Sequence, residues 1–147
     1  MKEINSRILL VEDEEADIEL ITNALQQFQM INGMDVAKDG EQALNYLFRR
    51  AEYAQRESAD PVLVLLDLKM PKVNGIEVLQ AMKSDSNLKT IPVVIVTSSR
   101  ENPDIRTCYE LGVNAYVVKP VDFREFTEAI RNVGLFWLLV NQIPKLN

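Results

Sequence analysis

Apolar runs of strand length alternate along this chain with segments whose apolar residues recur at helical spacing. Three runs, at residues 8–11, 62–66 and 92–96, are apolar on both faces and predict strands buried inside a sheet. A fourth run at 115–118 and a weaker one at 34–38 bring the predicted strands to five. Strands that alternate with helices form parallel sheets, so we expect an α/β fold with a doubly wound, five-stranded parallel sheet and five helices.

In the segments between these strands, apolar residues recur at helical spacing. The first helix is predicted over 16–29 and the last from near 122 to about 141, each with one apolar stripe. The apolar faces of the second and third helices contain Ala43, Leu44, Leu47, Phe48, Ile76, Leu79 and Met82. Pro103 can open the fourth helix in its first turn and Gly112 can close it. Asp39 and Gly40 indicate a turn, and the polar stretch 49–60 indicates an exposed helical extension and loop.

Length, charge and cysteine content limit the class of protein. The 147 residues suffice for one domain, and we expect a single domain over 1–147. The formal net charge of -6 argues against binding to a nucleic-acid backbone. The single cysteine, Cys108, cannot form an internal disulfide and is expected to be buried. The amino-terminal residues lack the apolar core of a signal peptide, and the apolar run 135–140 is too short to span a bilayer. We therefore expect a cytoplasmic protein that binds neither nucleic acid nor membranes.

Chemically active residues follow three of the predicted strands. Glu12 and Asp13 follow the first strand, Asp67 follows the third, and Lys119 follows the fifth. Because open parallel sheets bind ligands beyond the carboxyl ends of their strands, we expect these side chains to form one site. Asp67 alone has an ordinary interpretation as a turn or helix-capping acid. Three strand-end acids together with a lysine are instead the constellation of an active site.

The chemistry of this cluster favours a metal ion and a phosphoryl group. Carboxylates at about 4 Å repel one another by about 4 kcal/mol per pair, so the group needs a cation. Mg²⁺ fits best because it takes oxygen ligands, keeps some of its waters and accompanies phosphoryl groups. Lys119 supplies a positive charge for a phosphoryl oxygen, and Thr97, at the end of the fourth strand, supplies a hydroxyl donor. Together these residues indicate a site for phosphoryl transfer.

Four short motifs now carry a family resemblance. Residues 11–13, 66–71, 96–98 and 118–120 read Val-Glu-Asp, Leu-Asp-Leu-Lys-Met-Pro, Val-Thr-Ser and Val-Lys-Pro, and each lies at the end of a predicted strand. In this order they resemble the signature of response-regulator receiver domains, which have the CheY-like variant of the flavodoxin-like fold. The resemblance spans nearly the whole chain. It implies a protein of a two-component phosphorelay.

The resemblance also implies a role for each site residue. Asp67 would accept a phosphoryl group from a phosphohistidine on a sensor histidine kinase, and Thr97 and Lys119 would bind the phosphoryl oxygens. Asp13, Asp67 and the backbone carbonyl of Lys69 would ligate Mg²⁺. Glu12 stands where the family often has Asp, and it would join the metal directly or through water.

Further implications of the resemblance concern the switch that follows phosphorylation. Tyr116 would change rotamer together with Thr97, although an aromatic residue in a strand more often serves packing alone. The peptide bond between Lys119 and Pro120 would be cis. Lys69 and Ser99 occupy positions that the family uses to control the access of water to the phosphorylated Asp67.

A narrower resemblance links the chain to single-domain regulators of phytochrome-type sensor kinases. It rests on the acidic segment 12–17, the insertion 49–54 and the apolar ending 136–140. The chain contains no histidine, so the phosphoryl donor must be another molecule. A single domain leaves no room for an effector, so we expect output through a downstream protein or a phosphotransfer protein. The chain would be a phosphoacceptor that promotes its own phosphorylation and dephosphorylation, and not an enzyme with a separate substrate.

Two other functions would use some of the same residues. A haloacid-dehalogenase-type phosphatase would use Asp67 as nucleophile, but it needs a second acid at the position of Lys69. A pseudo-receiver would bind partners without being phosphorylated, but it would not need the full set of site residues. The acids Glu14, Glu15, Asp17 and Glu19 are most simply a solvated face that favours the amino end of the first helix.

The carboxyl-terminal helix predicts a homodimer. One apolar stripe recurs along it at helical spacing, and beyond Gly134 further apolar residues surround the helix. The stripe and these additions are Phe123, Phe126, Ile130, Val133, Trp137 and Val140, with Leu135, Phe136, Leu138 and Leu139. A single small domain covers only one side of such a helix, so a second copy would cover the rest. The alternative is that the end folds back onto the insertion near Tyr53.

Overall fold

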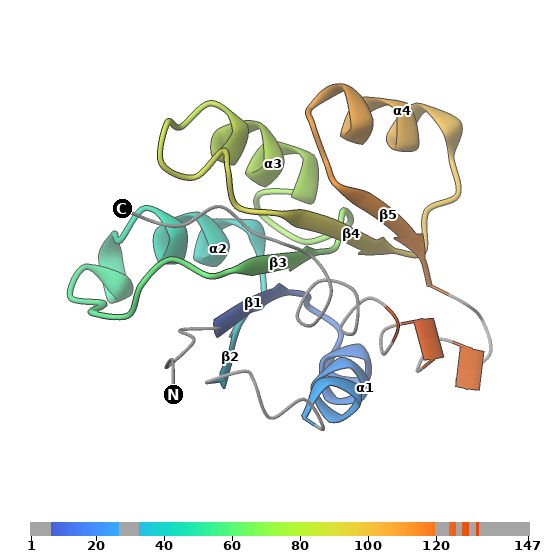
Figure 1. Cartoon of the computed structure of the whole chain (residues 1–147), viewed down its shortest axis with the longest axis horizontal. Coiled ribbons are helices and arrows are strands. Elements are labelled where there is room, and N and C mark those ends of the chain that lie inside the picture. Colours follow the sequence, from blue (N-terminus) through green and yellow to red (C-terminus); the bar gives the residue numbers. More distant parts are fainter. Residues whose placement is uncertain (1–6, 27–32, 120–123, 126–127, 130–131, 133–147) are drawn as a thin grey trace, which may run out of the picture.

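The computed structural model describes residues 7–26, 33–119, 124–125, 128–129 and 132. Five parallel strands form one sheet in the order β2-β1-β3-β4-β5 (Figure 1). Their bounds are Arg7–Val11 for β1, Gly33–Ala37 for β2, Leu63–Leu66 for β3, Val93–Thr97 for β4 and Ala115–Val118 for β5. The predicted fold class is confirmed, and no predicted strand end differs from the observed one by more than one residue.

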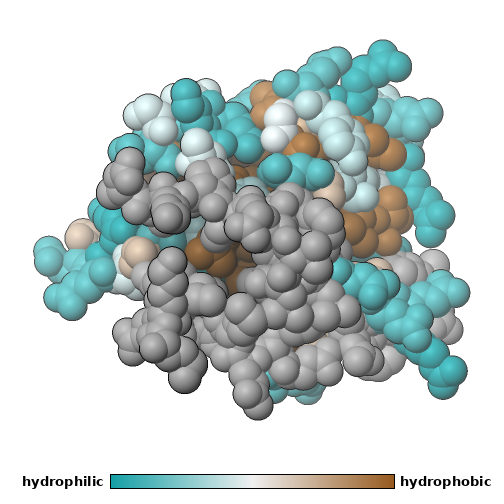
Figure 2. Space-filling model, in the orientation of Figure 1, coloured by the Kyte–Doolittle hydropathy of each residue, from teal (hydrophilic) through white to brown (hydrophobic). Residues whose placement is uncertain are grey.

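The position of each strand in the sheet explains its hydrophobicity. Every residue of β3 and β4 is buried, as expected for inner strands that are covered on both faces. The four residues of β5, an edge strand, are all half-buried. Figure 2 shows a mostly hydrophilic described surface in this view, with apolar areas over β5 and α4.

In the described part of the chain, four α-helices lie on the two faces of the sheet. Their bounds are Glu15–Leu25 for α1, Gly40–Leu47 for α2, Gly75–Lys83 for α3 and Asn102–Glu110 for α4. In Figure 1, α2, α3 and α4 cover one face and α1 covers the other. Alternate residues of β1 separate two apolar cores, with Leu9 and Val11 on the face of α2 and α3, and Ile8 and Leu10 on the face of α1. This period of two is the expected result of the strand pleat.

Helix starts and stops follow the local chemistry of the sequence. Asp39 is the N-cap of α2, and its carboxylate accepts a hydrogen bond from the amide of Gln42 at 2.7 Å. The predicted turn at this point is therefore the beginning of a helix. Pro103 lies in the first turn of α4, and Gly112, with φ of +91°, follows its last turn as predicted.

The segment 49–60 is a largely exposed loop, as predicted, but it corrects the prediction of a helical extension. It does not extend α2, which ends at Leu47, because Arg49 and Ala51 have positive φ angles of 55° and 51°. A short 3-10 helix follows at Ala51–Tyr53. The Arg56 side chain, expected to be exposed, is only 6% exposed and lies 4.1 Å above the Tyr46 ring. The contact between Arg56 and Tyr46 therefore holds this segment against α2.

Arg56 belongs to a group that we call the arginine cluster: Arg7, Asp35, Tyr46 and Arg56. Arg7 binds the Asp35 carboxylate through two nitrogens, at 2.7 and 3.0 Å. The Tyr46 hydroxyl donates to the same carboxylate. Arg56 donates to the carbonyl oxygens of Tyr46, Ser58 and Ala59 at 2.9 to 3.2 Å. The cluster joins β1, β2, α2 and the segment 49–60 through charged hydrogen bonds.

The predicted fifth helix lies largely outside the described residues. Within the range of its prediction, the described residues Arg124, Glu125, Glu128, Ala129 and Asn132 are helical. The apolar residues that predict a homodimer all lie outside the described part of the chain, so that interface stays a prediction. None of the helices in the described part has the length and apolar character needed to cross a membrane. Cys108 is buried, as predicted.

Candidate functional site

Strand pairing brings the ends of β1, β3, β4 and β5 to one edge of the sheet. The amide of Asp67 donates to the carbonyl of Val11 at 3.0 Å, which aligns the end of β3 with that of β1. The amide of Lys119 donates to the carbonyl of Thr97 at 2.7 Å, which aligns the end of β5 with that of β4. The backbone therefore places the predicted site residues side by side before any side-chain contact is considered.

Three carboxylates meet at this edge. Oxygen atoms of Glu12, Asp13 and Asp67 lie within 4.8 Å of one another. Glu12 is 1% exposed and Asp67 is 6% exposed, so little water screens their charges. Asp67 Oδ1 accepts a hydrogen bond from the amide of Leu68 at 2.8 Å, which fixes the orientation of this carboxylate. Hard oxygen donors in this arrangement fit a divalent cation, because they supply the ligands that such ions prefer.

The Lys119 ammonium lies among these acids. Its Nζ is 2.9 and 3.1 Å from the two carboxylate oxygens of Glu12, and 3.5 Å from Oδ2 of Asp67. A further carboxylate, that of Asp17 in the first turn of α1, is closer still at 2.8 Å. We call these five residues, Glu12, Asp13, Asp17, Asp67 and Lys119, the acidic cluster.

Asp17 was missed by the sequence prediction, which assigned it to a solvated face with its acidic neighbours. Three of those neighbours, Glu14, Glu15 and Glu19, are indeed exposed, whereas Asp17 is half-buried. A signal was present, because Asp17 stands in the first turn of the helix that directly follows the strand-end acids. Spacing alone did not show which of the four acids faces the site.

Burial and unbalanced charge shift the pKa of both charged partners in this cluster. Burial, followed by the negative charge of Asp67, raises the pKa of Glu12 to about 8, although Lys119 opposes the shift. Burial lowers the pKa of Lys119, but hydrogen bonds to Asp17 and Glu12 and the charge of Asp67 outweigh it and raise that pKa overall. Lys119 therefore remains a cation, and its surroundings disfavour the negative charge of Glu12.

The residues predicted to form a switch lie beside the acidic cluster. Thr97, fully buried at the end of β4, accepts a hydrogen bond at Oγ1 from the amide of Ser99 at 3.4 Å. The Tyr116 hydroxyl donates to the carbonyl of Ser99 at 3.0 Å. The Ser99 hydroxyl in turn donates to the Asp104 carboxylate in α4. Thr97 and Tyr116 thus contact the same residue of the loop between β4 and α4.

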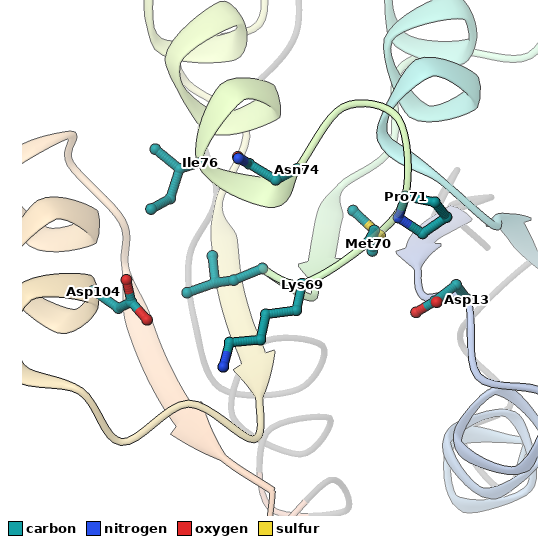
Figure 3. A pocket seen from close by; sticks show the side chains of 8 residues that line it. Asp13, Lys69, Met70, Pro71, Asn74, Ile76 and Asp104 are labelled. Carbon is teal, nitrogen blue, oxygen red and sulfur yellow. The ribbon is translucent and has the colours of Figure 1, made fainter.

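A hollow of about 420 Å³ opens next to the cluster (Figure 3). Asp13 lies on one side of it and Asp104 on the other, and the loop that contains Lys69, Met70 and Pro71 runs between them. The Lys69 side chain, which is exposed, points toward Asp104 in this view. The predicted role of Lys69 concerns its backbone carbonyl, and that role stays a prediction. The predicted cis bond also stays a prediction, because Pro120 lies outside the described residues.

Gly75 lets the loop after β3 close tightly behind Asp67. Its amide donates to the carbonyl of Leu68 at 2.9 Å, and a Cβ at this position would come within 2.1 Å of the carbonyl oxygen of Asp67. Asn74, the N-cap of α3, accepts a hydrogen bond from the amide of Glu77 at 3.0 Å. The first turn of α3 therefore packs directly against the residue at the centre of the site.

Comparison with known proteins agrees with this geometry. The family model described as "Response regulator receiver domain" matches residues 8–131. The chain is 39% identical to the probable methanogenesis regulatory protein FilR2 of Methanothrix harundinacea, over 93% of this chain and 86% of that protein. It is 36% identical to the response regulator Rcp1 of Synechocystis, over 93% of this chain and 92% of Rcp1.

Solved structures show the same likeness in three dimensions. The phosphorylated cyanobacterial phytochrome response regulator RcpA superposes with a TM-score of 0.92 at 38% identity, over 97% of this chain and all of that one. The Mn²⁺-bound form of Rcp1 has a TM-score of 0.88 at 36% identity, over 95% of this chain and 99% of that one. The site residues, the strand order and these relatives agree, and the chain belongs to the response-regulator receiver domain family.

Proposed function

We propose that this receiver domain accepts a phosphoryl group on Asp67 from a phosphohistidine of a sensor histidine kinase. The observation that carries the proposal is the setting of Asp67, which is nearly buried, surrounded by acids and 3.5 Å from the Lys119 ammonium. Neighbouring carboxylates repel one another, so such a site favours the binding of a cation. A phosphoryl group on Asp67 would in turn be stabilised by that cation and by Lys119. A buried acid with a purely structural role would instead have a cationic or hydrogen-bond-donating partner for each of its carboxylate oxygens.

Asp67 has one oxygen suited to the transfer. Oδ1 is held by the amide of Leu68, whereas Oδ2 faces Lys119. In the step that we propose, Oδ2 donates an electron pair to phosphorus while the bond from phosphorus to the imidazole nitrogen breaks. The imidazole nitrogen leaves with the electron pair of the broken bond to phosphorus. Lys119 then pairs with one phosphoryl oxygen, and the Thr97 hydroxyl donates to another.

Glu12, Asp13, Asp67 and the backbone carbonyl of Lys69 would hold Mg²⁺. The fit rests on the donor set, because all of these ligands are oxygens and three carboxylates lie within reach of one ion. When bound, Mg²⁺ would offset the negative charge of the phosphoryl oxygens and of the carboxylates. That Rcp1 binds Mn²⁺ in its crystal structure supports a divalent ion in this family.

The proposed output is a change in protein association. A phosphoryl group adds about -1.5 to -2 charges at Asp67, and it would draw the Thr97 hydroxyl toward itself. Thr97 and Tyr116 both bind Ser99, so a movement of Thr97 would free Tyr116 to change rotamer. The altered surface near β5 and α4 would then be read by a downstream protein or a phosphotransfer protein.

The partner and the location complete the proposal. Similarity to Rcp1 and RcpA supports a phytochrome-type sensor kinase as the phosphoryl donor. The protein would act in the cytoplasm, as a phosphoacceptor that promotes its own phosphorylation and dephosphorylation. Dimerisation through the carboxyl-terminal helix remains part of the proposal on the strength of its sequence pattern alone.

The test is phosphorylation by acetyl phosphate, followed by intact-protein mass spectrometry. We expect one phosphoryl group to be added in the presence of Mg²⁺ and none after chelation. Asp67→Asn should abolish the addition, whereas Asp85→Asn, which changes a loop aspartate outside the site, should leave it intact. Unchanged modification of Asp67→Asn would refute the site. A wild-type protein that stays unmodified with Mg²⁺ and donor would favour the pseudo-receiver.

A further inference from the structure

The Lys119 ammonium is shared unequally among three carboxylates. Its Nζ lies 2.8 Å from Asp17 and 2.9 Å from the nearer oxygen of Glu12, but 3.5 Å from Asp67. Hydrogen bonds between an ammonium and a carboxylate are about 2.7 to 2.9 Å long. Lys119 therefore bonds fully to Asp17 and Glu12, and it is held back from the residue that we assign as phosphoacceptor.

Asp17 reaches Lys119 from a different element than the strand-end acids. It lies in the first turn of α1, and its side chain is 27% exposed, against 1% for that of Glu12. Among the groups that could hold a metal ion in the described residues, Glu12, Asp13 and Asp67 are included and Asp17 is not. A cation bound by the other three acids would thus leave the contact between Asp17 and Lys119 in place.

We propose that Asp17 is a positioning residue that holds the Lys119 ammonium away from Asp67 and so keeps Oδ2 of Asp67 open. An ammonium has three N–H donors and forms hydrogen bonds with the carboxylates that lie around it. Without the charge of Asp17, the remaining partners are Glu12 and Asp67, so the ammonium would move onto Asp67. There it would cover the nucleophilic oxygen and compete with a divalent cation for the same carboxylates.

The held-back position also suits the phosphorylated protein, and in this respect the inference rests on the proposed function. A phosphoryl oxygen on Asp67 would extend beyond Oδ2 by one phosphorus atom. An ammonium in direct contact with Oδ2 would have to withdraw to make room for it. Lys119, at 3.5 Å from Oδ2, has a shorter distance to withdraw than an ammonium in direct contact would have.

The test compares Asp17→Asn with Glu14→Gln, which removes one charge from the exposed side of the same chain segment. Calorimetric titration of Mg²⁺ should give a dissociation constant about threefold to fivefold higher for Asp17→Asn, the effect expected of one partly exposed ion pair. Glu14→Gln should change it by less than about 1.5-fold, because its charge is screened by water. Asp17→Glu, which keeps the charge, should recover most of the affinity.

A spectroscopic signal reports the ammonium itself. The ¹⁵N resonance of the Lys119 ammonium, assigned by its loss in Lys119→Arg, should shift in Asp17→Asn and keep its position in Glu14→Gln. In a Lys119→Met background, Asp17→Asn should raise the Mg²⁺ dissociation constant no further than Glu14→Gln does, because Asp17 acts through Lys119. Slower modification of Asp17→Asn by acetyl phosphate should recover when Mg²⁺ is saturating.

The outcomes separate this inference from the proposed function. Equal Mg²⁺ affinities for Asp17→Asn and Glu14→Gln, or an unmoved ammonium resonance, would overturn the role of Asp17. A wild-type protein that takes up no phosphoryl group would overturn the proposed function instead. In that case the Mg²⁺ titration and the ammonium resonance still decide whether Asp17 positions Lys119.

Discussion

The arginine cluster and the acidic cluster both extend from β1, but their charges are balanced very differently. In the arginine cluster the Asp35 carboxylate faces Arg7, the Tyr46 hydroxyl and the more distant charge of Arg56. Burial alone would raise the pKa of Asp35, yet the bonds to Arg7 and Tyr46 outweigh it and lower that pKa. The folded chain therefore favours the ionised form of Asp35.

The acidic cluster contains four carboxylates and a single ammonium, which contacts three of them. Here burial and the neighbouring Asp67 raise the pKa of Glu12 to about 8, so folding disfavours its ionised form. The two clusters contain similar groups at similar distances. Their opposite effect on a carboxylate comes from burial, since the Glu12 side chain is 1% exposed and that of Asp35 is 31% exposed, and from the ratio of positive to negative partners.

This difference distinguishes a structural group from a functional one. A fully paired cluster stabilises the fold and has no remaining capacity to bind an ion. An underpaired cluster costs stability in the metal-free protein, and that same excess of negative charge attracts a divalent cation. We expect substitutions in the arginine cluster to lower stability and those in the acidic cluster to lower ion binding.

The largest expected effect follows from Arg56→Ala. The substitution removes a guanidinium that donates to three carbonyl groups and stacks on Tyr46. We expect the free energy of unfolding, measured in urea, to fall by about 3 kcal/mol, because those carbonyls lose their partners in a buried setting. Arg56→Lys should recover little of it, since a lysine lacks the planar set of donors.

The Arg56→Ala protein should still bind Mg²⁺ with wild-type affinity at 25 °C, where enough of it remains folded. This result would separate the two clusters. A Mg²⁺ affinity that fell together with stability would show that the two clusters act as one unit.

The second prediction concerns Glu12→Gln, which should stabilise the metal-free protein at high pH. The pKa of Glu12 is raised from an ordinary 4.5 to about 8, so its contribution to stability is present below about pH 4.5 and is lost as the pH rises through about 8. At pH 9 the variant should therefore be more stable by at most a few kcal/mol, the difference should shrink steadily as the pH falls from 8, and below about pH 4 the two proteins should be nearly equal. Mg²⁺ should raise the melting temperature of wild type but not of the variant. Equal stabilities at pH 9 would show that Lys119 fully compensates Glu12.

The acidic cluster and the arginine cluster also differ in how far the sequence could predict them. Strand-end positions identified Glu12, Asp13, Asp67 and Lys119 because parallel strands all present their carboxyl ends at one edge. Uniformly apolar runs placed β1, β3 and β4 to within one residue, because these strands are covered on both faces of the sheet. The arrangement of the site therefore follows from local pattern and one rule of topology.

No comparable rule predicts the arginine cluster from the sequence. Asp35 is 28 residues from Arg7 and 11 from Tyr46, and no motif links them. Arg56 looked like one of several exposed charges, because a sequence does not show that a positive φ at Arg49 turns the chain back toward Tyr46. The side-chain contacts of irregular segments depend on such turns and are visible only in three dimensions.

The third prediction tests the arginine cluster at the opposite end of the pH scale. Asp35→Asn should lower the free energy of unfolding by about 1 to 2 kcal/mol at pH 7, a value discounted because Arg7 and Asp35 side chains are 28% and 31% exposed. The pKa of Asp35 is lowered from its ordinary 3.8, so its contribution is present above that value and is lost as the pH falls through the lowered pKa. Urea unfolding between pH 2 and 7 should show the two proteins converging at the acid end. A constant difference at every pH would assign the loss to packing and not to charge.

The smallest effect is expected from Glu15→Gln, which breaks an ion pair outside both clusters. Glu15 and Lys38 lie 2.6 Å apart, closer than Lys119 is to any of its carboxylates. Their side chains are 73% and 59% exposed, however, so water and salt screen the pair. We expect a loss of about 0.5 kcal/mol or less, vanishing in 1 M salt, in contrast to the arginine cluster. A loss as large as that of Asp35→Asn would mean that distance, rather than burial and the balance of partners, decides what a charged group contributes to this fold.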